Sequence, residues 1–333
     1  MIRSARPRSR AAAVLTASVL AAPLLLGALA GCAASPAAPP SSQSDVAVAV
    51  ENCGVRVEFA AAPERVITIK STSTEMLLAL GLGDRIVGTA FQDGPVPDEW
   101  AAAADDLPSI SDMMPSEEVV LDLEPDLVYS GWESAFAPDA AGDRAELAAL
   151  GVASYVQPAA CRSAGAPTKL TFDEVFNEIE EVASIFRVDG TALIDEQKAQ
   201  LAAITPDDRG LTALWYSSGD DIPYVGAGTG APQLVLDAVG LTNVAGDIDQ
   251  TWTSLGWEPI VDADPDVIVL IDADWNTAAS KIATLEANPA TAKLSAVANS
   301  RYIVLPFAAG EAGVRTVSAA ASVSEQLAAL DLP

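Results

Sequence analysis

The residues of this chain that could take part in chemistry are carboxylates, hydroxyls, lysine, arginine and tryptophan, because its 333 residues include no histidine. That absence excludes imidazole general bases, His-ligated zinc and His-ligated haem. Neither a Gly-x-Ser-x-Gly elbow nor a Gly-x-x-x-x-Gly-Lys phosphate loop is present, and we interpret the glycine-rich segment 226–230 as a turn. We therefore expect no enzyme, no catalytic residue, no metal site and no cofactor.

Two cations have sequence surroundings that suit an anionic ligand. Lys70 ends an apolar run and precedes Thr72-x-x-Glu75, a capping-box pattern that opens a helix. Exposed amides at a helix N-terminus next to a lysine favour anions. Arg315 is the second candidate, although pairing with Glu311 is an equal alternative.

Tryptophans supply the other half of a candidate ligand site. Trp132 and Trp275 follow predicted strands, and aromatic residues make up only 5% of the chain. Such side chains are stacking platforms for a flat conjugated ligand. Trp215 could equally be a core residue. The predicted ligand-binding residues are Lys70, Ser71, Thr72, Trp132, Glu133, Trp215, Tyr216, Trp275, Phe307 and Arg315.

Short apolar runs alternate with helical patterns, which predicts parallel sheets covered by helices. Ligands of such sheets bind beyond the carboxyl ends of the strands, where the candidate residues lie. A helix is predicted at Thr191–Ala203 after a first one at 172–186. The predicted strands are 66–69, 86–91, 127–130, 153–156, 211–216, 234–239, 267–271 and 302–305.

The second half of the chain echoes the first. Residues 118–128 match residues 258–268 at a constant offset of 140 positions, each copy opening on a glutamate and containing Pro-Asp before an apolar strand. The repeat predicts two similar lobes joined by a single helix, with a ligand cleft between them. The predicted parts are a signal (1–32), a flexible tether (33–50), a first lobe (51–188), the connecting helix (189–205) and a second lobe (206–333).

The first 32 residues have the pattern of an export signal. Four arginines precede an apolar run that ends in Leu-Ala-Gly-Cys32, which resembles the lipobox of bacterial lipoproteins. A transmembrane anchor is the alternative. We expect Cys32 to carry a lipid anchor. The net charge of −28 argues against nucleic-acid binding. Outside the cytoplasm, Cys53 and Cys161 would form a disulfide, and two free buried thiols are the alternative.

Several segments resemble one family. Pro63-Glu64-Arg65-Val66-Ile67, the Pro-Asp turn of each lobe and Asn288-Pro289 are similar to the iron-siderophore and vitamin B12 class of periplasmic binding proteins, whose two α/β lobes are joined by one rigid helix. The resemblance implies an extracytoplasmic, monomeric binding protein that delivers a small molecule to an ABC permease dimer with ATPase subunits. It also implies that Glu118 and Glu258 dock onto permease arginines, with Glu117 as the alternative to Glu118.

A finer resemblance concerns the ligand. Val50-Glu51-Asn52-Cys53-Gly54 and Ser130-Gly131-Trp132-Glu133-Ser134 look like a branch that imports a phospholactate precursor of the deazaflavin coenzyme F-420. This resemblance implies a conjugated anionic ligand. A ferric siderophore, cobalamin or haem is the alternative within the class. A sensory lipoprotein is the alternative from another class.

Overall fold

The computed structural model describes residues 47–163, 165 and 168–332. The predicted export signal with Cys32 lies outside the described residues, as does most of the predicted tether. The end of that tether prediction is wrong, because β1 (Val48–Asn52) begins inside it and pairs antiparallel with β2 (Val55–Phe59). Val50 and Asn52 of β1 are buried while Ala49 and Glu51 are exposed, which is the alternation of a half-buried strand.

The first sheet has the parallel architecture that the sequence predicts. Its five strands run in the order β5-β4-β3-β6-β7, and every neighbouring pair is parallel. Strands β3 and β6 are buried along their whole length, as strands covered on both faces are. The strands are β3 (Val66–Ile69), β4 (Ile86–Ala90), β5 (Ser109–Ser111), β6 (Leu127–Ser130) and β7 (Ala153–Val156); the helices are α1 (Ser71–Ala79), α2 (Asp98–Ala104), α3 (Glu117–Leu121) and α4 (Arg144–Ala149), with 3-10 turns η1 (Gly83–Arg85), η2 (Glu133–Phe136) and η3 (Pro158–Ala160).

The second sheet combines a parallel centre with an antiparallel edge. Strands β10, β8, β12 and β13 are parallel, whereas β9 and β11 add antiparallel neighbours on one side. Two lobes with parallel sheets are thus confirmed. The strands are β8 (Thr212–Ser218), β9 (Tyr224–Gly226), β10 (Thr242–Asn243), β11 (Trp252–Ser254), β12 (Val267–Asp272) and β13 (Tyr302–Pro306).

The predicted strand at 234–239 is wrong, because these residues belong to α7 (Ala231–Ala238). Six consecutive residues of α7 are buried, so apolar residues do not alternate with polar ones at the spacing of an amphipathic helix. The other helical segments of this lobe are α8 (Trp257–Ala263), α9 (Ala278–Ala287), α10 (Ser295–Ala298) and α11 (Thr316–Ala329), with 3-10 turns η4 (Thr291–Lys293) and η5 (Phe307–Gly310).

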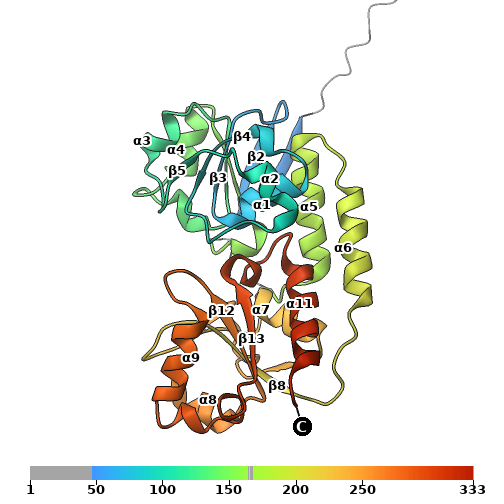
Figure 1. Ribbon diagram of the computed structural model, residues 1–333. Coiled ribbons are helices and arrows are strands. Elements are labelled where there is room, and N and C mark those ends of the chain that lie inside the picture. The colour runs from blue at the N-terminus through green and yellow to red at the C-terminus, as the bar shows by residue number, and fades with distance from the viewer. Residues whose placement is uncertain (1–46, 164, 166–167, 333) are drawn as a thin grey trace, which may run out of the picture. The chain divides into compact units, whose positions relative to one another are not determined.

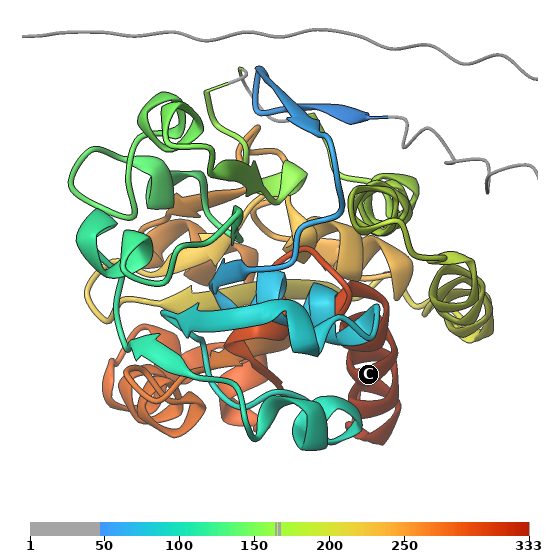
Figure 2. The ribbon, with the colours of Figure 1, turned by 90° about the horizontal axis from the view of Figure 1, so that it is seen from above.

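Two helices connect the sheets. In α5 (Phe172–Phe186) a full capping box of Thr171 and Glu174 closes the N-terminus, and Phe176, Ile179 and Val182 pack into the core of the first lobe. Helix α6 (Thr191–Ala203) follows and leads to β8 of the second sheet. Figure 1 shows α5, α6 and α11 along one side of both sheets, and the view from above shows α5 and α6 at their flank (Figure 2).

The repeat in the sequence is a repeat in the structure. The aspartates of the two Pro-Asp turns make equivalent hydrogen bonds. Asp126 accepts from the N–H groups of Glu64 and Arg65 before β3. Asp266 accepts from the N–H and hydroxyl of Thr212 at the start of β8. Each turn therefore ties the short helix before it to the strand beside it. None of the helices that the structure describes has the length and apolarity of a membrane span.

Candidate ligand-binding site

A cavity of about 1360 Å³ lies at the carboxyl ends of the strands of both sheets. Trp132 follows β6, Trp275 follows β12, and Phe307 follows β13, so the chain turns that line the cavity come from both lobes. Four of the predicted ligand-binding residues line it: Trp132, Glu133, Trp275 and Phe307.

Lys70 is not among the lining residues, and the predicted anion site there is wrong. Its side chain is 2% exposed and forms a salt bridge with Asp93, which is also buried. The other oxygen of Asp93 accepts the N–H of Ser71, and the Ser71 hydroxyl accepts the N–H of Asp93. Ser71 and Thr72 are buried with Lys70 and do not line the cavity. Asp93 thus occupies the place that the sequence assigns to a ligand.

Arg315 is also committed to the protein's own carboxylate. Its guanidinium donates to both oxygens of Glu75, at 2.7 and 2.5 Å, and not to Glu311. Burial raises the pKa of Glu75 to about 7, against the opposing effect of Arg315. The capping box predicted at Thr72 and Glu75 is therefore wrong, because Glu75 reaches across to the second lobe instead.

Trp215 and Tyr216 are core residues rather than ligand contacts. Both are fully buried in β8, where Trp215 belongs to the apolar core of the second lobe. The Tyr216 hydroxyl donates to the carbonyl of Gly219 at 2.7 Å. The core alternative is the one that the structure supports for Trp215.

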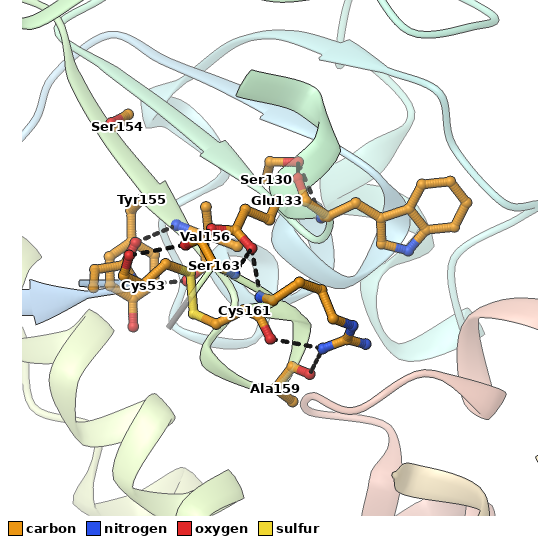
Figure 3. The surroundings of a disulfide bond; sticks show 12 residues. Cys53, Ser130, Glu133, Ser154, Tyr155, Val156, Ala159, Cys161 and Ser163 are labelled. Atoms are coloured by element: carbon orange, nitrogen blue, oxygen red, sulfur yellow. Dashed lines mark hydrogen bonds between the residues drawn. A yellow bond between two sulfur atoms is a disulfide. The ribbon is translucent and has the colours of Figure 1, made fainter. Parts of the chain in front are cut away.

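Glu133 lines the cavity but holds a neighbouring loop (Figure 3). Its carboxylate accepts hydrogen bonds from the N–H groups of Arg162 and Ser163 and from the Ser163 hydroxyl. Burial alone would raise the pKa of Glu133, but these hydrogen bonds lower it. The same loop is joined to β1 through a disulfide between Cys53 and Cys161, whose Cα atoms are 5.1 Å apart.

Two cations line the cavity, Arg144 and Arg162, and the sequence analysis singled out neither. The Arg144 guanidinium donates four hydrogen bonds to Asn52 and Ser154, whereas Arg162 lies in the loop after the disulfide. The Arg162 guanidinium donates to the carbonyls of Ala159 and Cys161 and, across the lobes, to the hydroxyl of Thr251 at 3.1 Å. Among the described residues, Arg162 has no carboxylate partner within 4.0 Å. Its place beside Cys161 is the one feature of the sequence that could have pointed to it.

Three further aromatic residues line the cavity without having been predicted, namely Phe136, Tyr224 and Trp252. Tyr224 in β9 and Trp252 in β11 stack on each other, with ring centroids 6.0 Å apart. They are diagonal neighbours in the antiparallel β9–β11 pair, where Trp252 lies opposite Gly226 and Tyr224 lies opposite Ser254. Trp275 and Phe307 form a second pair, edge to face at 5.7 Å. Trp275 is 65% exposed, so one ring of that pair is open to solvent.

Acidic groups of the cavity are partly neutralised by burial. Glu311 accepts the indole N–H of Trp132 at 2.9 Å, which links the two lobes, and burial raises its pKa. Glu178 on α5 accepts the hydroxyl of Tyr129 at 2.9 Å, and burial raises the pKa of Glu178 to about 8. Burial therefore favours the neutral form of Glu178 and Glu311, which reduces the negative charge of the cavity.

The two predicted docking glutamates occupy equivalent places. Glu118 is the second residue of α3, Glu258 is the second residue of α8, and both are exposed. Val120 and Ile260, two positions further on, are fully buried and anchor the two helices alike. Glu117 is less exposed than Glu118.

Comparison with known protein families gives a match to the model of the family described as "Periplasmic binding protein", over residues 66–309. This range covers the strands of both parallel sheets and most of the residues that line the cavity.

The chain belongs to this family.

Relatives agree with the assignment. An uncharacterized ABC transporter substrate-binding lipoprotein, YvrC, of Bacillus subtilis (strain 168) is 26% identical over 276 residues, 80% of each chain. A cobalamin-binding protein of Halobacterium salinarum is 27% identical over 228 residues, 62% of this chain and 53% of its own. The structure of an ABC-type Fe3+-hydroxamate transport system from Saccharomonospora viridis has 26% identity and a TM-score of 0.72, covering 84% of this chain and 98% of that one.

This periplasmic binding protein is the substrate-binding component of an ABC transporter of the siderophore, vitamin B12 and haem class, and it works outside the cytoplasm. Its relatives are binding proteins and not enzymes, so the expectation of a non-catalytic protein is confirmed.

Proposed function

We propose that this binding protein captures a bulky, conjugated organic anion and delivers it to its permease, and that the ligand is the phosphorylated deazaflavin precursor of coenzyme F-420. The observation that carries the proposal is the combination, in one cavity, of paired aromatic rings and an arginine without a carboxylate partner. The aromatic rings alone would also suit a neutral conjugated ligand, and the arginine alone would also suit a small anion.

The rings supply the apolar contact. Tyr224 with Trp252 and Trp275 with Phe307 form two aromatic surfaces that line the cavity. Stacking of a conjugated ring on such a surface contributes about 1–3 kcal/mol, by analogy with bases on aromatic side chains.

Arg162 supplies the charge selectivity. In a protein of net charge −28, an anion is repelled at long range, so it must be held by a local cation. Arg162 is suited to this, because Lys70 and Arg315 are already neutralised by Asp93 and Glu75. A charge-assisted hydrogen bond to the ligand contributes about 1.5–3 kcal/mol.

A ferric siderophore or a corrinoid is the second candidate, and the cavity size favours it. At about 1360 Å³ the cavity exceeds the roughly 300–1,000 Å³ of ordinary small-molecule pockets. The relatives named for cobalamin and for Fe3+-hydroxamate are 26–27% identical to this chain. Both ligands are bulky, and the siderophore would also present oxygen atoms to Arg162.

The proposal includes how the protein is held and how it docks. We propose that Cys32 carries a lipid anchor after cleavage of residues 1–32, that the mature protein is a monomer, and that Glu118 and Glu258 contact arginines of the permease. The equivalent, exposed positions of the two glutamates support the docking. Glu118→Ala with Glu258→Ala should leave ligand affinity unchanged and reduce uptake in cells. Unchanged uptake would remove both residues from the mechanism.

Identification of the bound molecule tests the ligand directly. Protein purified from its native host should carry a ligand with the near-ultraviolet and visible absorbance of a deazaflavin, and mass spectrometry should give the mass of the phospholactate form. Calorimetric titration with the phosphorylated precursor should then show binding at micromolar concentration or below. Binding of a ferric siderophore or a corrinoid, with none of the deazaflavin, would establish the second candidate.

A further inference from the structure

The loop from β9 into α7 is the glycine-rich segment 226–230. The N–H groups of Ala227, Gly228 and Thr229 donate to the carbonyls of residues 251, 248 and 250 at 3.0–3.1 Å. A Cβ on Gly228 would lie 2.1 Å from the carbonyl oxygen of Gly246, so this glycine is required by backbone packing. The glycines therefore explain how the loop packs, but they are not themselves evidence of a ligand.

Backbone donors at the end of this loop are unused. The N–H groups of Gly230 and Ala231 donate to no acceptor among the described residues, and both residues line the cavity. Gly230 is the N-cap residue of the eight-residue helix α7 and has no side chain that could cap it. The partial positive charge of the helix N-terminus therefore faces the cavity without compensation.

The hydroxyl of Thr229 is a second, independent observation. Thr229 lines the cavity and is 5% exposed, and its hydroxyl has no hydrogen-bond partner among the described residues. A buried hydroxyl without a partner costs free energy, so an acceptor that reached Thr229 would relieve that cost. This hydroxyl adds a donor next to the two free amides.

Arg162 approaches the same place from the first lobe. Its hydrogen bond to Thr251 brings the guanidinium next to Gly230, because a Cβ on Gly230 would lie 3.2 Å from the Cα and carbonyl oxygen of Thr251. Three of its five N–H groups are used by Ala159, Cys161 and Thr251. The other two have no acceptor among the described residues and can serve a ligand.

We propose that the N-terminus of α7, the Thr229 hydroxyl and the Arg162 guanidinium form an oxyanion site that holds the phosphate of the ligand. Two amides, a hydroxyl and a guanidinium match a compact group with three or more acceptor oxygens. Trp252, opposite Gly226 in the β9–β11 ladder, places an aromatic surface beside the site. The identity of the ring rests on the function proposed above, whereas the oxyanion site can be tested without it.

Inorganic phosphate is the first probe. In amide NMR spectra of the mature protein, millimolar phosphate should shift the resonances of Gly230 and Ala231, and Arg162→Gln should weaken this titration at least tenfold. Thr229→Val, which removes the hydroxyl and keeps the shape, should weaken it several-fold. Arg209→Gln is the matched control, because Arg209 is bound to Asp207 on the surface and should leave the titration unchanged.

The second probe is the deazaflavin in its phosphorylated and dephosphorylated forms. Arg162→Gln should weaken binding of the phosphorylated form at least tenfold and change that of the other form less than twofold. Phosphate shifts at Gly230 and Ala231 without any deazaflavin binding would support the oxyanion site and reject the proposed ligand. The site itself would be overturned if phosphate caused no shifts at Gly230 and Ala231 and if Arg162→Gln and Thr229→Val bound the phosphorylated deazaflavin as tightly as the wild type does.

Discussion

Two strand-to-helix loops of this protein each place a cation near the N–H groups of a helix N-terminus. They differ in whether a carboxylate of the chain binds these donors. In the first lobe, the turn from β3 to α1 places Lys70 beside the N–H of Ser71, and Asp93 binds both. In the second lobe, the turn from β9 to α7 places free amides at Gly230 and Ala231 near Arg162. The first loop is an anion site filled by the protein's own carboxylate. At the second loop, no described carboxylate pairs with Arg162 or accepts the N–H groups of Gly230 and Ala231.

The comparison shows that a cation beside a helix N-terminus indicates an affinity for anions but does not say which anion. A carboxylate of the same chain makes the site structural, because it is tethered beside the cation and occupies the site intramolecularly. Only the site left without such a partner is available for a ligand. The predictions below test each side of this difference.

The largest effect is expected from removal of the internal anion. Asp93→Asn leaves the buried ammonium of Lys70 without its carboxylate and should lower the free energy of unfolding by about 3–5 kcal/mol. Chemical denaturation measures this change. The double variant Lys70→Met with Asp93→Leu should recover most of the loss, since it buries no charge. A single variant as stable as the wild type would show that Asp93 does not fill the first site.

The disulfide supports the second site from the first lobe. Replacement of Cys53 and Cys161 by serine should lower the free energy of unfolding by about 2–5 kcal/mol, because the bridge spans 108 residues of sequence. It should also weaken phosphate binding, because the loop that carries Arg162 loses its attachment to β1. If phosphate binding is unchanged, then Glu133 alone is sufficient to position the loop.

Aromatic substitutions separate ring binding from anion binding. Trp252→Leu should weaken binding of the phosphorylated and the dephosphorylated deazaflavin alike, by about 1–3 kcal/mol, because it removes the stacking surface. Calorimetric titration measures both affinities. Trp100→Leu is the control, because Trp100 packs against the core of the first lobe and does not line the cavity. A loss restricted to the phosphorylated form would contradict the separate roles.

A separate test concerns pH. The pKa of Glu178 lies at about 8 in the folded protein, above its ordinary value of 4.5, so the folded state binds more protons between these values. Stability should therefore fall as pH rises from about 5 to 8. Glu178→Gln should reduce this slope, because an amide does not titrate. The amide oxygen can still accept the hydroxyl of Tyr129, so the local hydrogen bond is kept. An unchanged slope in denaturation midpoints would show that Glu178 is ionised in the folded protein.

Much of the fold could be predicted because local patterns decide it. The alternation of apolar strands and helices, the 140-residue repeat and the helical spacing in α5 depend on neighbours in sequence. The strand predicted at 234–239 failed for a local reason as well, since α7 is buried on nearly every face and shows no period. Composition alone could not distinguish a fully buried helix from a buried strand.

Residues of the site could be predicted only where their place at the end of a strand brings them to the cavity. Trp132, Trp275 and Phe307 line the cavity because they follow strands whose carboxyl ends face it. The partners Asp93 and Glu75 were missed because a contact between distant loops leaves no mark in a single sequence. Arg162 and Trp252 were missed for the same reason, as their roles depend on the lobes facing each other.

The location of the ligand's phosphate tests the central claim most directly. Crystals grown with the phosphorylated deazaflavin should show the phosphate oxygens within hydrogen-bond distance of the N–H groups of Gly230 and Ala231 and of the Arg162 guanidinium, with the ring on Trp252. A phosphate bound to Lys70 in place of Asp93, or one that contacts neither α7 nor Arg162, would contradict the account.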